Sequence, residues 1–169
     1  VTTVSFANGI EEIGTGVCKG YISLERVALP DTLVTIGSDA FFNCSSLTGI
    51  TIPNSVTTIG TNAFNGCIAL ISADLSCKAT VIPDGLFTGC KSLTTAALPS
   101  YTTDIGVAAF SGCSSLASIN IPDTVKTIAK DAFNGWASSA FPFPPSSKPS
   151  AKWLSRTAQV LPRSSFPTR

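Results

Sequence analysis

The stretch LTGITIPNSVTTIGTNAFNGCIA, residues 47–69, decides the fold because most of the chain repeats it with substitutions. Each copy opens on a leucine, and these leucines stand 23 residues apart, at Leu24, Leu47, Leu70, Leu93 and Leu116. A fixed period of about 20 to 50 residues is typical of proteins built from stacked structural repeats. The sequence therefore predicts six coils of 23 residues, the first beginning at Val1, in one elongated solenoid.

The pattern inside a coil, numbered 1 to 23 from its leucine, predicts the local structure. Positions 4 and 6 are mostly apolar and alternate with polar or small residues, which is typical of a β-strand with one buried face. Position 10 is mostly apolar and position 13 is always isoleucine, so a second, shorter extended segment is expected there. Adjacent apolar residues at positions 17 and 18 predict one short helical turn. The isoleucine column is Ile13, Ile36, Ile59, Ile82, Ile105 and Ile128.

Two columns of glycine indicate two different constraints on the backbone. Position 20 is glycine in five coils and Asn43 in the other, which predicts a left-handed backbone after the helical turn. Position 14 is also rich in glycine but accepts Pro83 and Ala129. Because proline cannot adopt a positive φ, glycine at position 14 is expected to allow close packing instead.

The repeat pattern L-x-x-I-x-I-P-x-x-V-x-x-I-G-x-x-A-F-x-x-C, carried by residues 1–136, resembles the BspA-like leucine-rich repeats, also called the Treponema pallidum type. The second, third and sixth coils carry it nearly intact, the fourth and fifth with substitutions, and the first loosely. The resemblance implies a right-handed solenoid with a parallel β-sheet on its inner face. It also implies secreted or surface-attached proteins that bind host, matrix or neighbouring-cell proteins. The departures are Ser76, Pro83, Trp136 and everything after it.

We predict two regions, a leucine-rich repeat solenoid at 1–137 and a basic tail rich in proline and serine at 138–169. The solenoid has six basic and ten acidic residues, whereas the tail has five basic residues and no acidic one. The tail is expected to be disordered or irregular, although a segment that folds over the last coil and an unrelated sequence fused to a truncated array remain alternatives. The chain lacks methionine and shows no signal peptide and no apolar run of about 18 residues, so a processed or excerpted chain without a membrane span is expected.

The composition argues against catalysis. The sequence contains no histidine, which removes the commonest general base and metal ligand. The acidic residues mostly stand at turns, and no glycine-rich phosphate loop is present. We therefore expect no enzyme, no cofactor and no metal, and the lack of a basic stripe with aromatic residues argues against nucleic acid.

The cysteines are predicted to be structural. Four of them share position 21, one coil apart, and are expected to form a column of small buried thiols; they are Cys44, Cys67, Cys90 and Cys113. Cys18 takes the place of a core phenylalanine and is also expected to be buried. Cys77 stands at a turn position and is expected to be exposed.

The first strand of each coil supplies the predicted binding surface. Positions 3 and 5 face outward and are small and weakly charged, which suits a broad, shallow protein contact; they include Arg26, Ala28, Gly49, Thr51, Ser72, Asp74, Thr95, Ser118 and Asn120. Repeat proteins bind through such surfaces. The predicted function is a non-catalytic, adhesin-like module, extracellular or at the cell surface, that binds proteins through its concave face. Alternatives are a cytoplasmic scaffolding repeat, which unpaired cysteines would suit, and ice or surface binding through threonines at positions 11 and 12.

Overall fold

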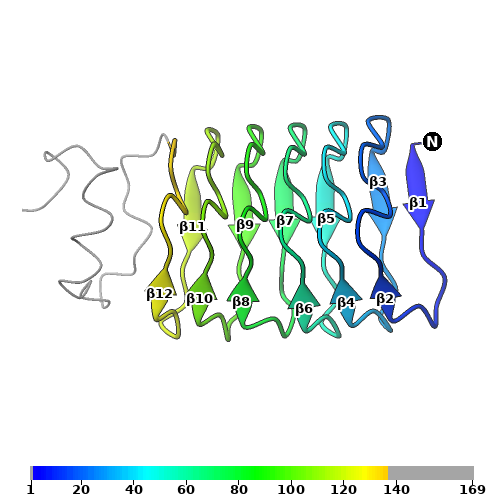
Figure 1. The fold of residues 1–169 in the computed structure, drawn as a ribbon, viewed down its shortest axis with the longest axis horizontal. Helices are drawn as coiled ribbons and strands as arrows, with labels where there is room; N and C mark the ends of the chain where they lie inside the picture. The colour runs from blue at the N-terminus through cyan, green and yellow to red at the C-terminus, as the bar shows by residue number, and fades with distance from the viewer. Residues whose placement is uncertain (1, 137–169) are drawn as a thin grey trace, which may run out of the picture.

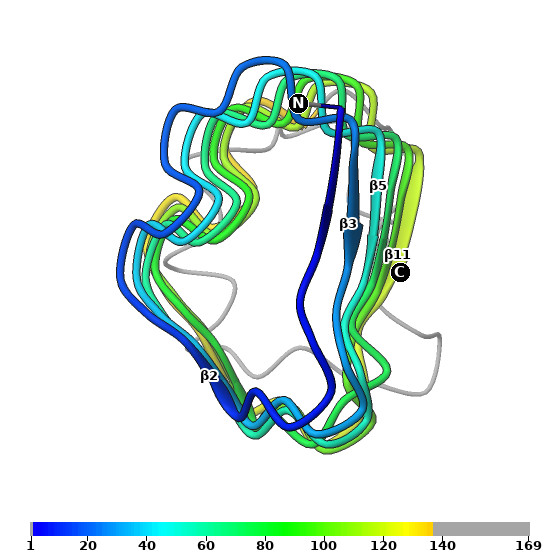
Figure 2. The same ribbon diagram turned by 90° about the vertical axis from the view of Figure 1, so that its right-hand side faces the viewer.

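The computed structural model describes residues 2–136, which wind into a solenoid of six coils (Figure 1). Each coil contributes a three-residue strand with an odd number and a two-residue strand with an even number. Seen from the N-terminal end, the chain runs clockwise as it recedes, so the solenoid is right-handed (Figure 2). The strands are β1 (Thr3–Ser5), β2 (Glu12–Ile13), β3 (Arg26–Ala28), β4 (Thr35–Ile36), β5 (Gly49–Thr51), β6 (Thr58–Ile59), β7 (Ser72–Asp74), β8 (Val81–Ile82), β9 (Thr95–Ala97), β10 (Asp104–Ile105), β11 (Ser118–Asn120) and β12 (Thr127–Ile128).

The strands stack into two parallel faces, which the predicted repeat explains directly. The odd strands line one side of the solenoid in the orders β1-β3 and β5-β7-β9-β11 (Figure 2). The even strands line the other side in the orders β2-β4-β6 and β8-β10-β12. Paired residues lie 23 positions apart, as in Ser72 beside Thr95 and Ile36 beside Ile59. The predicted repeat solenoid is therefore confirmed.

The even-strand face has one interruption, between β6 and β8, and it has a chemical cause. In neighbouring coils the amide at position 14 donates to the carbonyl at position 13 of the preceding coil, as Gly60 N does to Ile36 O at 2.7 Å. In the fourth coil this position is Pro83, which has no N–H and cannot donate to Ile59 O. One departure from the family pattern thus coincides with the break in hydrogen bonding.

The core is a set of columns running along the solenoid. The position-13 isoleucines form one continuous column, in which the first five are buried and Ile128, in the last coil, is half-buried. Beside it, Phe41, Phe64, Phe87 and Phe110 are fully buried. Their rings stack with centroids 5.3 to 5.7 Å apart. Such contacts, repeated between coils, make the stability close to a sum of nearest-neighbour interfaces.

Positions 15 to 21 form successive turns, so the predicted helical turn is wrong. Each turn is closed by an amide that donates to the carbonyl three residues back, as Phe42 N does to Asp39 O at 3.0 Å. The left-handed backbone predicted at position 20 is confirmed, with a φ of 56° at Asn43. A second left-handed residue lies at position 16, with a φ of 56° at Asn62. This second residue prevents the backbone from continuing as a helix.

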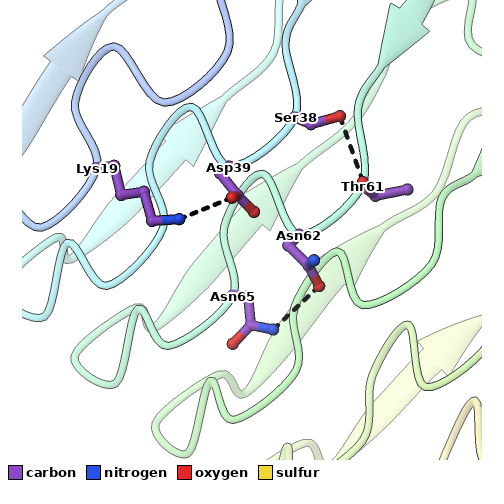
Figure 3. Close-up of polar contacts among 6 residues, drawn as sticks. All are labelled: Lys19, Ser38, Asp39, Thr61, Asn62 and Asn65. Atoms are coloured by element: carbon purple, nitrogen blue, oxygen red, sulfur yellow. Dashed lines mark hydrogen bonds and ion pairs between the residues drawn. The ribbon is translucent and has the colours of Figure 1, made fainter.

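Polar side chains of these turns link neighbouring coils (Figure 3). Lys19 Nζ lies 2.9 Å from Asp39 Oδ2 of the next coil, and 4.8 Å from the centre of the Phe42 ring. The Thr61 hydroxyl donates to the Ser38 hydroxyl across 3.3 Å. Exposed ion pairs contribute at most about 1 kcal/mol, so the buried columns and backbone ladders provide most of the stability.

The boundary predicted at residue 137 stays a prediction, and the predictions for the tail lie outside the described residues. Within residues 2–136 there is no helix of the length and hydropathy that crossing a membrane requires.

Candidate functional site

The outward side chains of β3, β5, β7, β9 and β11 form one surface, called the odd-strand face below. All nine residues predicted for the binding surface lie on it, since side chains of a strand alternate between core and solvent. Gly49 and Asp74 are half-buried and the other seven are exposed. The structure thus brings the predicted residues together, while their role in binding stays a prediction.

A shallow depression with a volume of about 680 Å³ lies over the odd-strand face. Its lining comes from all five of these strands, because glycine, alanine, serine and threonine keep the surface low. Gly49 leaves a gap between Arg26 and Ser72, its neighbours at position 3 in the flanking coils. Ala97, at position 5, also lines the depression, as the predicted alternation implies, whereas Thr48 lines it and lay outside the predicted positions. Thr48 was missed because position 2 precedes the strand whose alternation guided the prediction.

The hydroxyl groups of this face divide into two rows with different roles. At position 2, Thr48 Oγ1 donates to Glu25 O at 3.3 Å, and Thr94 Oγ1 donates to Ile71 O at 3.0 Å, so this row links adjacent coils. At position 3, one hydroxyl follows another in register along β7, β9 and β11, namely Ser72, Thr95 and Ser118. None of these three hydroxyl groups forms a hydrogen bond to a side chain or carbonyl within residues 2–136, so this row is available to a ligand.

The two charged side chains of the odd-strand face are not equally available. Asp74 Oδ1 accepts hydrogen bonds from the Ser76 amide at 2.9 Å and the Ser76 hydroxyl at 2.5 Å. This carboxylate therefore holds the turn that replaces the usual proline. Arg26 takes part in neither of the two ion pairs found within residues 2–136, so its guanidinium is free to contact a carboxylate of a partner.

An apolar rim borders the depression at the edge where the chain enters the odd strands. Ile68 and Ile71 are 48% and 52% exposed, and Ile71 N donates to Thr48 O at 2.8 Å, which places Ile71 beside the lining, three residues along the chain from Ile68. Exposed apolar side chains next to free polar groups are typical of protein-binding surfaces. The signal missed in the sequence is isoleucine at position 22 of the third coil and position 2 of the fourth; position 22 is also isoleucine in the first coil, as the exposed Ile22, whereas three of the remaining coils have Ser or Lys there.

The cysteine column is structural, as predicted. Its thiols are fully buried, and each donates across coils to the carbonyl at position 18 of the preceding coil, as Cys67 Sγ does to Phe41 O at 3.3 Å. Burial raises the pKa of Cys44 to about 11 and that of Cys113 to about 12. The thiolate is therefore strongly disfavoured, which removes these thiols as nucleophiles.

Cys18 is buried, as predicted, but the prediction that Cys77 is exposed is wrong. Cys77 is only 5% exposed. With serine in place of proline at residue 76, Asp74 caps the turn and Cys77 N donates to Leu75 O at 2.6 Å. The altered turn directs the thiol into the core. In the part of the chain that the structure describes, no three His, Cys, Asp or Glu side chains lie close enough to hold a metal ion.

Solved structures share this fold. The leucine rich repeat protein of T. pallidum has a TM-score of 0.69 at 23% identity, over 96% of this chain and 84% of that protein. A leucine-rich repeat protein of Eubacterium ventriosum has a TM-score of 0.72 at 20% identity, over 90% of this chain and 47% of its own. A leucine rich cell surface protein of Faecalibacterium prausnitzii has a TM-score of 0.62 at 28% identity, over 90% of this chain and 50% of its own. This chain thus spans about half the length of the last two proteins.

No curated protein matches the sequence. Residues 2–139 match the family described as "BspA type Leucine rich repeat region (6 copies)". The 23-residue period, the parallel coils and this match together show that the chain belongs to the BspA-type leucine-rich repeat family.

Proposed function

We propose that this chain is a non-catalytic protein-recognition module of a secreted or cell-surface, adhesin-like protein. Its odd-strand face binds a host, matrix or neighbouring-cell protein. The observation that carries the proposal is the register of free hydroxyls over the depression, with Arg26 at one end and exposed isoleucines at the rim. Leucine-rich repeats are protein-interaction modules, and one structural relative is called a cell surface protein.

The shape of the surface favours a protein over a small molecule. Small-molecule sites are usually enclosed and lined by hydrophobic and aromatic side chains. The odd-strand face is open, its lining includes no aromatic side chain, and its polar groups extend across five strands. A partner contacts this face broadly, with Ile68 and Ile71 as the apolar part of the contact and the hydroxyl row as the polar part.

The test measures binding of the purified chain to a panel of matrix and cell-surface proteins, followed by substitutions in the odd-strand face. Thr51→Arg and Thr95→Arg together place two long, charged side chains over the depression. We expect them to weaken binding at least about tenfold, roughly 1.4 kcal/mol, by excluding the partner sterically and by charge. Ile71→Ser is expected to weaken binding through loss of the apolar contact.

The matched control is Thr58→Arg, the same substitution at an exposed threonine of β6 on the even-strand face. It is expected to leave binding unchanged. Equal binding by the Thr51→Arg, Thr95→Arg variant and the Thr58→Arg variant would remove the odd-strand face as the site. Comparison of residues 1–137 with the full chain then separates binding by the coils from binding by the basic tail.

A second candidate function, an intracellular scaffolding repeat, is favoured by one observation. All six cysteines are unpaired, as is usual in reducing compartments. The two proposals differ in where the protein is found. Labelling of intact source cells with a membrane-impermeant reagent supports the first proposal if this protein is labelled, and the second if it is labelled only after lysis.

A further inference from the structure

Three asparagines of the sequence are followed directly by glycine, at 8–9, 65–66 and 134–135. Such pairs deamidate most readily, because glycine has no side chain to hinder its amide nitrogen from reaching the asparagine side-chain carbonyl carbon. The reaction requires the glycine amide to be free and the asparagine side chain to rotate. The three pairs differ in how the coils hold these two groups.

In the third coil, hydrogen bonds hold both the glycine amide and the asparagine side chain of the pair. Gly66 N donates to Thr88 O of the next coil at 2.8 Å. Asn65 Nδ2 donates to Asn62 Oδ1 at 3.1 Å, as Figure 3 shows. The side chain of Asn65 is also half-buried. Attack by Gly66 therefore requires the interface between the third and fourth coils to open first.

The pair in the sixth coil occupies the same repeat positions, but neither of these two groups is hydrogen-bonded within residues 2–136. Within residues 2–136 the amide of Gly135 has no acceptor, and the exposed side chain of Asn134 makes no hydrogen bond. The turn itself is the same, since φ is 78° at Gly135 and 75° at Gly66. The difference lies in the absence of a following coil among the described residues and in Asp131, which stands where the third coil has Asn62.

We propose that Asn134 is the site at which the folded protein deamidates. Gly135 N loses its proton to a base in solution and bonds to Asn134 Cγ, while the bond from Cγ to Nδ2 breaks and ammonia leaves. Water then opens the resulting succinimide at either carbonyl, which gives aspartate or isoaspartate. Neither product requires an oxidant or a reductant. Asn134 O accepts a hydrogen bond from Gly112 N at 2.7 Å, so isoaspartate, with its extra backbone atom, loosens the last coil.

The pair in the first coil tests the mechanism separately. Asn8 is exposed, but Gly9 N donates to the Thr32 hydroxyl at 3.0 Å. Thr32→Val removes this acceptor and keeps the size of the side chain. The substitution should raise the deamidation rate of Asn8 without changing the rates of Asn65 and Asn134.

The experiment incubates the full chain at pH 8.5 and 37 °C and follows the three sites by mass spectrometry of proteolytic peptides. The same incubation in concentrated urea gives the rates without the fold. We expect Asn134 to react at least about tenfold faster than Asn65 in the folded protein, because Asn65 reacts only through local opening. The two rates should converge in urea. Native rates for Asn65 that equal or exceed those of Asn134, or an Asn8 rate unchanged by Thr32→Val, would overturn the proposal.

Discussion

Gly60, at position 14 of the third coil, should tolerate alanine poorly, whereas Gly14, at the same position of the first coil, should tolerate it well. A Cβ atom added to Gly60 would lie 2.3 Å from Ser38 N and 2.6 Å from both Gly37 C and Ser38 Cα. Ordinary contacts of a Cβ atom begin near 3.4 Å. All three atoms belong to the main chain of the preceding coil, so no side-chain rotation can relieve the clash. The second and third coils would have to separate by about 1 Å at this point.

The separation has two costs, both of which follow from the structure. Overpacking of this kind costs about 1–3 kcal/mol. It also stretches the hydrogen bond from Gly60 N to Ile36 O, now 2.7 Å, whose full loss would cost about 0.5–1.5 kcal/mol. We therefore expect Gly60→Ala to lower the free energy of unfolding by roughly 2–4 kcal/mol.

The first coil supplies the matched control, because no coil precedes it within residues 2–136. A Cβ atom added to Gly14 would meet only Val17 Cγ2, at an ordinary 3.6 Å. The φ of Gly14 is not positive, so Gly14→Ala should raise stability by about 0.4–1 kcal/mol by reducing the entropy of the unfolded chain. Urea titrations followed by circular dichroism measure both effects. Effects of the same sign for Gly14→Ala and Gly60→Ala would refute the packing explanation of this column.

Three further predictions concern the core, the left-handed turns and the thiols. Phe64→Ala should cost about 3–5 kcal/mol, since Phe64 is fully buried between two stacked rings, whereas Phe6→Ala should cost clearly less because Phe6 is half-buried; urea titration compares them. Ala108→Gly should stabilise the protein by about 0.5–1 kcal/mol because the φ of Ala108 is 54°, and an unchanged thermal midpoint would contradict this strain. Burial raises the pKa of Cys44 to about 11, and it raises that of Cys67 and Cys90 as well, so the folded protein binds protons that the unfolded chain releases above about pH 8.5. The contribution of these thiols to the free energy of unfolding is therefore full below about pH 8.5 and falls as the pH rises towards the pKa values of the folded protein. The Cys67→Ala, Cys90→Ala double variant should lose less stability between pH 8 and pH 10.5 than the unaltered protein.

The repeat made most of the fold predictable, because stacking imposes the same environment on each position of every coil. The isoleucine column, the buried thiols and the left-handed position 20 all follow from which residue types recur. The failures lie where a coil departs from the pattern or where two signals compete. Ser76 changes the turn that buries Cys77, and the left-handed residue at position 16 overrides the apolar pair that suggested a helical turn. The sequence does contain a signal for this left-handed residue, because position 16 is glycine, aspartate or asparagine in five coils. These are the residue types that most readily adopt a left-handed backbone.

The sequence identifies the outward positions that form the proposed binding surface, but it does not identify a partner, and both facts have the same cause. Side chains that meet the next coil are fixed by the repeat, as when Asn43 Oδ1 lies so close to Gly66 Cα that a Cβ there would come within 2.0 Å of it. Position 3 points away from the core, and its side chain differs between coils, from Arg26 through Gly49 to Ser72. Information about a partner can reside only in positions that stacking does not fix. Alternation in a strand identifies those positions. The chemistry of a partner depends instead on combinations of side chains from several coils, which the repeat period does not describe. Examples are Arg26, the hydroxyl row and the rim of Ile68 and Ile71.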